Sequence, residues 1–87
     1  MAIVFIPTQL RQLTNGIEQL ELDVRNVRQV VEELDARFPG IKQGLCDGDQ
    51  LSPSIQVCVG QTLSSRGMIT KVAADSEVHF LPAIGGG

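Results

Sequence analysis

The sequence is poor in aromatic residues and in the side chains that carry most enzyme chemistry. It has no Trp, no Tyr and three Phe among 87 residues, which leaves almost no platform for stacking nucleic-acid bases. It has one His and two Cys, whereas zinc and iron–sulfur sites draw three or four ligands from these residue types. Ten acidic against seven basic residues give a net charge of -3, which does not suit binding to a phosphate backbone. We therefore expect no metal site and no nucleic-acid partner.

Long hydrophobic runs are also missing. The longest one, Met1–Ile6, stops at Pro7 and is far shorter than the roughly 20 residues that a membrane span requires. The first residues lack the basic stretch of an export signal, and two Cys do not make a disulfide framework. We therefore expect a cytoplasmic protein without a membrane partner. Hydrophobic residues still make up 43% of the chain, so one small domain can fold around its own core.

The N-terminal part of the sequence predicts two antiparallel strands. The segment Ala2–Ile6 is dense in β-branched residues, which predicts a strand buried on both faces. After Asn15-Gly16, a dipeptide that favours hairpin turns, the alternation of Ile17, Leu20, Leu22 and Val24 with polar residues predicts a second strand. Between the two strands, two leucines are expected to pack onto the end of the sheet: Leu10 and Leu13.

A helix is predicted to follow these strands. Asn26 can cap its start, with Gln29 three residues further on, and Pro39-Gly40 ends it. Its apolar residues recur with helical spacing and should face the core: Val27, Val30, Val31, Leu34 and Phe38. The next segment, 41–53, has the composition of turns and is expected to be an ordered loop.

Three more strands are expected in the C-terminal half. Ile55, Val57 and Val59 alternate with more polar residues, and 62–65 can form a short strand before a turn at 66–68. The segment 77–82 should turn Val78 and Phe80 inward and His79 and Leu81 outward. The order strand, strand, helix, strand, short strand, strand predicts an α+β, β-grasp fold. Its mixed sheet has four to five strands, and one main helix crosses one face. We expect residues 1–82 to form this domain and residues 83–87 to form a flexible Gly-rich tail.

The tail consists of Ala83, Ile84, Gly85, Gly86 and Gly87, and its one reactive group is the carboxylate of Gly87. Five residues beyond Pro82 reach about 16 Å at about 3.3 Å each, and glycine lets the backbone pass through a narrow channel. Adenylation of this carboxylate on a partner enzyme, followed by attack of a sulfur donor, would give a thiocarboxylate. Three glycines are also typical of a frayed end or a linker. The functional interpretation is favoured because a strand ending in Phe80-Leu81-Pro82 delivers the tail directly.

Several segments resemble the ubiquitin-like sulfur carriers of the MoaD/ThiS family, most closely the CysO-like branch. They are 6–11 at the exit of the first strand, 38–40 at the helix end, 77–84 in the last strand and tail, and Gly86-Gly87. Two positions depart from the family pattern: Gly85 stands where that branch often has Ala, and Ala74-Asp75-Ser76 replaces a usual Gly-Asp turn.

The resemblance implies a protein co-substrate rather than an enzyme. Gly87 would be the site of adenylation and thiocarboxylate formation, and Gly86 would thread the tail into the partner. The implied partners are an adenylyltransferase of the ubiquitin-activating type that uses ATP, a sulfur donor protein or sulfide, and an acceptor enzyme. No cofactor would be bound stably. The pathway stays open among cysteine or methionine, molybdopterin, thiamine and related products.

Two other functional classes remain open on the sequence alone. The chain could be a protein modifier that forms isopeptide bonds to target lysines through Gly87, or a binding module with an idle tail. The residues along the tail exit are predicted to contact a partner: Leu81, Pro82, Ala83, Ile84 and Gly85. Cys46 and Cys58 are interpreted as packed or interface thiols because no activating residue neighbours them in sequence, and His79 as a sheet residue of the surface.

Overall fold

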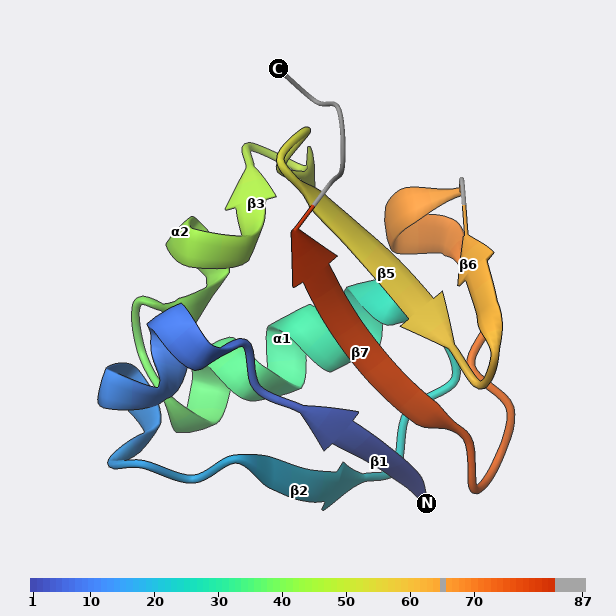
Figure 1. Ribbon diagram of the computed structural model, residues 1–87, viewed down its shortest axis with the longest axis horizontal. Helices are drawn as coiled ribbons and strands as arrows, with labels where there is room; N and C mark the ends of the chain where they lie inside the picture. Colours follow the sequence, from blue (N-terminus) through green and yellow to red (C-terminus); the bar gives the residue numbers. More distant parts are fainter. Residues whose placement is uncertain (65, 83–87) are drawn as a thin grey trace.

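The computed structural model describes residues 1–64 and 66–82, and a mixed five-stranded sheet forms its centre (Figure 1). The strands lie in the order β2 (Gln19–Leu22), β1 (Ala2–Phe5), β7 (Glu77–Pro82), β5 (Ile55–Val59) and β6 (Thr62–Ser64). β1 and β7 run parallel, whereas the other neighbouring strands are antiparallel. Helix α1 (Val27–Arg37) crosses one face of the sheet. The predicted β-grasp arrangement is confirmed.

The core lies between α1 and the sheet face that the helix covers. The alternation of β7 turns Val78 and Phe80 toward the helix, and both are buried as predicted. Four apolar residues of the helix are completely shielded from solvent: Val27, Val30, Val31 and Leu34. Because each such side chain stabilises the fold by about 1.5–3 kcal/mol, this interface holds the helix on the sheet.

The start of α1 is capped as the sequence predicts. The backbone N–H of Gln29 donates a hydrogen bond of 2.8 Å to the side-chain oxygen of Asn26. In return, the side-chain oxygen of Gln29 accepts a hydrogen bond of 2.7 Å from the backbone N–H of Arg25. At the other end, Gly40 has a φ of 101°, a conformation that suits glycine, so the chain turns sharply after the helix.

The N-terminal region departs from the prediction in three respects. β1 is buried on one face only, because Ile3 and Phe5 point to the sheet face opposite α1 and are half-buried there. The connection to β2 is a 3-10 helix, η1 (Thr8–Thr14), which buries Leu10 but leaves Leu13 41% exposed. The expectation for Leu10 is therefore confirmed, and that for Leu13 is wrong. Ile17 lies before β2 and is also exposed.

The segment 41–53 contains more regular structure than the loop that was expected. It begins with a short helix, α2 (Ile41–Leu45), which buries Ile41 and Leu45 completely. A small hairpin of β3 (Cys46–Asp47) and β4 (Gln50–Leu51) follows. The loop prediction was wrong because burial of Ile41 and Leu45 favours a helical turn, although the local composition is typical of turns.

On the far side of β5, the chain forms the short strand β6 and a second 3-10 helix, η2 (Gly67–Ile69). The predicted short strand is confirmed over 62–64, and residue 65 lies outside the described residues. In the parts of the chain that the structure describes, no helix is both long and apolar enough to cross a membrane.

Candidate functional site at the end of β7

β7 occupies the middle of the sheet and ends at Pro82, where the tail begins. It pairs with β1 on one side and with β5 on the other. The pairing with β5 continues to its last residue, since Pro82 lies opposite Ile55 and Leu81 opposite Gln56. β1 pairs with β7 only as far as His79, so β5 alone holds the end of the strand from which the tail departs. The predicted tail residues lie outside the described residues: Ala83, Ile84, Gly85, Gly86 and Gly87.

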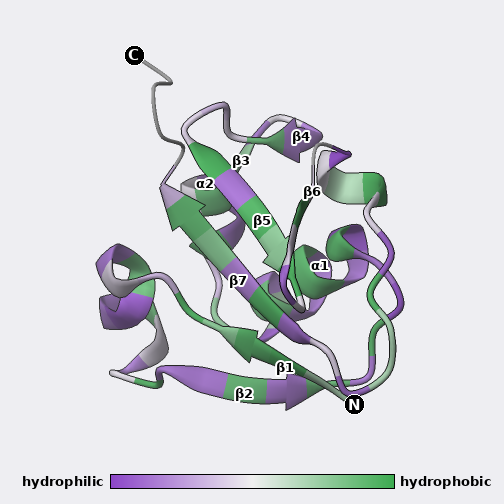
Figure 2. Cartoon of the chain, turned by 45° about the vertical axis from the view of Figure 1, so that its right-hand side comes forward, coloured by the Kyte–Doolittle hydropathy of each residue, from purple (hydrophilic) through white to green (hydrophobic). Residues whose placement is uncertain are grey.

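The sheet face opposite α1, called the outer face below, has no helix over it in the described structure (Figure 1). Figure 2 shows hydrophobic and hydrophilic residues alternating along β7 and β5. The strand registers place five residues in one row across the outer face: Leu63, Cys58, His79, Phe5 and Gln19. Leu63 is 58% exposed. Leu81 lies two residues beyond His79 on β7, on the same face, and is 40% exposed. The outer face thus presents apolar side chains from four strands to solvent.

The rings of Phe5 and His79 stack at the centre of this row. Their centroids are 4.2 Å apart and their planes differ by 10°, and stacked aromatic pairs contribute about 0.5–1.5 kcal/mol beyond buried area. The imidazole Nε2 of His79 also lies 3.1 Å from a carboxylate oxygen of Glu77. His79 projects outward as predicted, but the stack fixes its ring, so it is an ordered part of the outer face.

A hollow of about 260 Å³ lies beside the end of β7, between this strand and the exit of β1. It is lined by 5–9 with Arg11 and by 79–82, which overlap two of the four segments that resemble the family, 6–11 and 77–84. The side chain of Arg11 is held in place because its Nε donates a hydrogen bond of 3.0 Å to the carbonyl of Ile6. Its Nη1 lies 3.5 Å from a carboxylate oxygen of Glu18. The hollow therefore lies directly beside Leu81 and Pro82, the last described residues of β7.

The two cysteines keep the structural role that the sequence suggests. Cys58 lies opposite His79 in the β5–β7 pairing, a neighbour that the sequence could not show because 21 positions separate the two residues. Its thiol nevertheless donates to the carbonyl of Gly60 at 3.5 Å. For Cys46, burial raises the pKa of the thiol, and the nearby charges of Lys42 and Arg28 offset this only in part. Neither geometry resembles an activated nucleophile.

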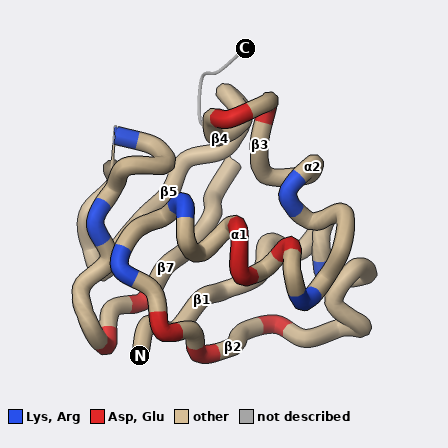
Figure 3. The backbone as a smooth tube through the Cα atoms, turned by 180° about the vertical axis from the view of Figure 1, so that it is seen from behind, with Lys and Arg blue, Asp and Glu red and all other residues tan. Residues whose placement is uncertain are grey.

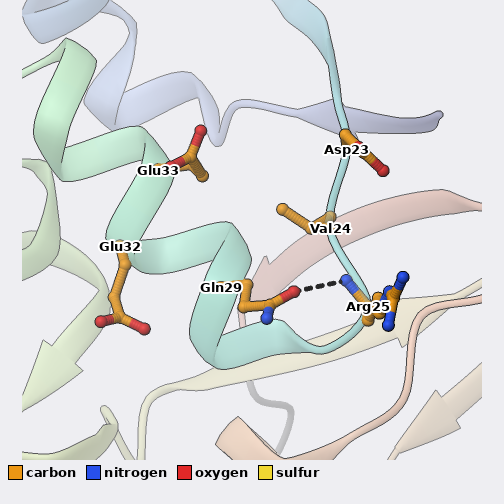
Figure 4. Close-up of a pocket in the computed structure, with 6 residues that line it drawn as sticks. All are labelled: Asp23, Val24, Arg25, Gln29, Glu32 and Glu33. Atoms are coloured by element: carbon orange, nitrogen blue, oxygen red, sulfur yellow. Dashed lines mark hydrogen bonds between the residues drawn. The ribbon is translucent and has the colours of Figure 1, made fainter.

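A further hollow of about 400 Å³ lies between α1 and the segment that follows β2 (Figure 4). It is lined by Asp23, Val24, Arg25, Gln29, Glu32 and Glu33. Figure 4 shows the carboxylates pointing in different directions, and within residues 1–64 and 66–82 no three acidic, His or Cys side chains are placed to hold a metal ion. We assign this hollow no role.

A mixed five-stranded sheet with one main helix across one face and a central last strand defines a ubiquitin-like β-grasp protein. Comparisons with known proteins agree. The model of the ThiS family matches residues 4–87. A chain of the Amycolatopsis orientalis BexX/CysO complex is 30% identical, with 100% of both chains covered and a TM-score of 0.88. Mycobacterium tuberculosis CysO is 28% identical over 97% of this chain and 100% of its own, with a TM-score of 0.85.

Small archaeal modifier protein 1 of Methanosarcina acetivorans is 24% identical over 99% of this chain and 95% of its own. Its TM-score of 0.77 shows a shared fold. No curated protein matches the chain. The chain belongs to the ThiS family of sulfur carriers. Members of this family serve as protein substrates of other enzymes, so the interpretation as a co-substrate rather than an enzyme is confirmed.

Proposed function

We propose that the carboxylate of Gly87 is the group that carries sulfur. A carboxylate oxygen attacks the α-phosphorus of ATP on the adenylating partner, and pyrophosphate leaves. Sulfide then attacks the carbonyl carbon of the acyl-adenylate and AMP leaves, which produces a C-terminal thiocarboxylate. The acceptor enzyme takes the sulfur from this group. Gly86 and Gly85 lack side chains, so they can pass through a narrow channel into either active site.

The observation that carries this proposal is the end of β7. A strand held by neighbours on both sides leads directly into the tail at Pro82, and the match to the family model extends to residue 87. In this proposal residues 1–82 are the body that partners recognise, and residues 83–87 are the segment that enters their active sites. The likeness to CysO favours cysteine biosynthesis among the pathways open to such carriers.

We further propose that the adenylating enzyme binds the outer face. This face continues into the tail exit through β7, because His79, Leu81 and Pro82 belong to the same strand. A partner that holds the tail must therefore lie close to this face. The stacked Phe5 and the exposed Leu81 provide the kind of central apolar contact that dominates binding energy in protein interfaces.

Thiocarboxylate formation is measured by intact mass spectrometry. The full chain is incubated with ATP, its adenylating enzyme and sulfide, and its mass should rise by about 16 Da, since sulfur replaces oxygen at the activated acyl group. The variant lacking Gly86 and Gly87 should fold and show no such rise. An unchanged mass of the full chain, with an enzyme shown to adenylate another carrier, would contradict the proposal. Conjugates that resist thiol reductants would indicate a protein modifier instead.

The outer face is tested with a matched pair of substitutions. Leu81 and Leu13 are 40% and 41% exposed, but of the two only Leu81 belongs to β7 and lines the hollow at its end. Leu81→Glu should lower kcat/KM for thiocarboxylate formation by about tenfold or more, because a charge would be buried in an apolar contact. Leu13→Glu should leave it within about twofold of the parent chain. Equal losses in both variants would place the partner elsewhere.

A further inference from the structure

A second surface, on the sheet edge beyond β6, combines positive charge with an exposed apolar residue. It is formed by Arg25, Arg28, Arg66, Ile69 and Lys71 and is called the basic surface below. All four cations are exposed, and Ile69 is 66% exposed. Figure 3 shows a group of basic positions on the side of the molecule away from α2 and β3. In a chain with ten acidic and seven basic residues, most of the positive charge is thus concentrated at one edge.

Two adjacent hollows shape this surface. One, of about 370 Å³, is lined by Arg25, Asn26, Arg28, Met68, Ile69 and Lys71. The other, of about 350 Å³, is lined by Val59, Thr62, Leu63, Ser64, Arg66, Thr70 and Lys71. Neither lining contains a carboxylate. In the described part of the chain none of the four cations forms an ion pair, so their charge is available to a partner.

The backbone beneath the basic surface is tied together at several points. The N–H of Val27 donates to the carbonyl of Thr70 at 2.9 Å, and the N–H of Val72 donates to the carbonyl of Arg25 at 2.8 Å. The hydroxyls of Ser64 and Thr70 lie 2.7 Å apart, which joins β6 to the end of η2. These contacts hold the segments that carry the cations in a fixed relative position, as a preformed binding surface requires.

Arg28 occupies a position that is unfavourable for the fold itself. It lies in the first turn of α1, and that turn contains no acidic residue. The positive end of the helix dipole disfavours a cation there by about 0.3–1 kcal/mol. Residues that oppose a local structural preference are expected where function requires them. A role in binding an anionic group explains why the cation stands at this end of the helix.

We propose that the basic surface binds an acidic segment of a partner protein, with an apolar residue of that segment placed against Ile69. A free phosphate fits less well, because the amides at the start of α1 are already used. The N–H groups of Val27 and Gln29 donate to Thr70 and Asn26. A nucleic acid fits less well because neither hollow contains an aromatic ring. Side-chain cations around an exposed apolar residue match an acidic peptide that also carries apolar groups.

The test uses the full chain and a fluorescein-labelled octapeptide of alternating Glu and Leu. Binding is followed by fluorescence anisotropy, and the contacted amides by NMR. We expect shifts at the basic surface, and about a tenfold weaker affinity when the salt concentration rises from 20 to 200 mM, because salt screens exposed charges. The double variant Arg28→Glu with Lys71→Glu should bind about tenfold more weakly or worse. Absence of binding, or shifts confined to other surfaces, overturns the proposal.

A control variant separates this surface from net charge. Arg37→Glu with Lys42→Glu changes the charge by the same amount at the opposite end of α1 and should retain affinity within about twofold. An equal loss of affinity in this control variant overturns the proposal. The proposal is also overturned if a thymidine octanucleotide or inorganic tripolyphosphate binds more tightly than the peptide and shifts the same amides. Arg28→Glu alone should also raise the melting temperature, which a purely structural arginine would not do. The assay uses neither ATP nor Gly87, so its failure is distinguishable from failure of the sulfur-carrier proposal.

Discussion

Replacement of Phe5 by Ala tests whether the outer face serves binding rather than folding. The ring is half-buried and stacked on His79. Loss of a fully buried Phe costs about 3–5 kcal/mol, whereas this ring is only partly buried and has no helix over it. We therefore expect a loss of about 1–2 kcal/mol in the free energy of unfolding, which lowers the melting temperature by about 4–16 °C in a domain of this size. The variant should stay folded at 20 °C.

Its effect on the reaction should be much larger than its effect on the folded fraction. If Phe5 is a central contact of the adenylating enzyme, its removal costs about 2 kcal/mol of binding, or about 30-fold in kcat/KM for thiocarboxylate formation. Phe38→Ala is the matched control, because Phe38 is also half-buried but lies at the end of α1. It should lose stability and keep its kcat/KM. Equal kcat/KM values in the two variants, both folded, would refute a binding role for Phe5.

Two further predictions concern stability and thiol reactivity. Asn26→Ala removes the side-chain cap of α1 and should lower the free energy of unfolding by about 1 kcal/mol. In thermal melts, Asn26→Ser should recover most of this stability, because Ser can also cap a helix. Equal melting temperatures for the two variants would contradict the role of the cap. Because burial raises the pKa of Cys46, less thiolate is present at a given pH. Its labelling by iodoacetamide at pH 8 should be slower than that of a small free thiol, and faster labelling would show that the thiol is not desolvated.

Much of the fold can be predicted because a few local signals are strong. The last strand runs from Glu77 to Pro82, as predicted. Val78 and Phe80 alternate with the polar Glu77 and His79, and Pro82 has no N–H to donate to a longer ladder. Asn26 and Gln29 mark the helix start, since the hydrogen bond between them is local. The tail residues of the proposed site, 83–87, follow that strand directly in sequence but lie outside the described residues, so their role stays a prediction.

Other features depend on contacts between distant segments. Helix α2 contains Gly44, a poor helix former, and its turn is favoured by burial of Ile41 and Leu45. An added Cβ on Gly44 would lie 2.6 Å from a methyl group of Leu10, so the glycine there reflects close packing against η1. The stack of Phe5 on His79 depends on strand register across most of the chain. Sequence spacing gives no sign of either contact.

The proposed division between body and tail also explains why a sulfur carrier needs few reactive side chains. The tail glycines offer a partner only backbone, so they cannot distinguish this carrier from another with the same ending. A partner must therefore distinguish carriers by their bodies, residues 1–82 in this chain. The two faces of the sheet then have different roles. The face under α1 contains the buried core, whereas the outer face keeps Phe5, Leu63 and Leu81 in contact with solvent. The basic surface and the hollow at the tail exit share no residue. Under the two proposals above, a partner that contacts both regions would identify the carrier before its tail reacts.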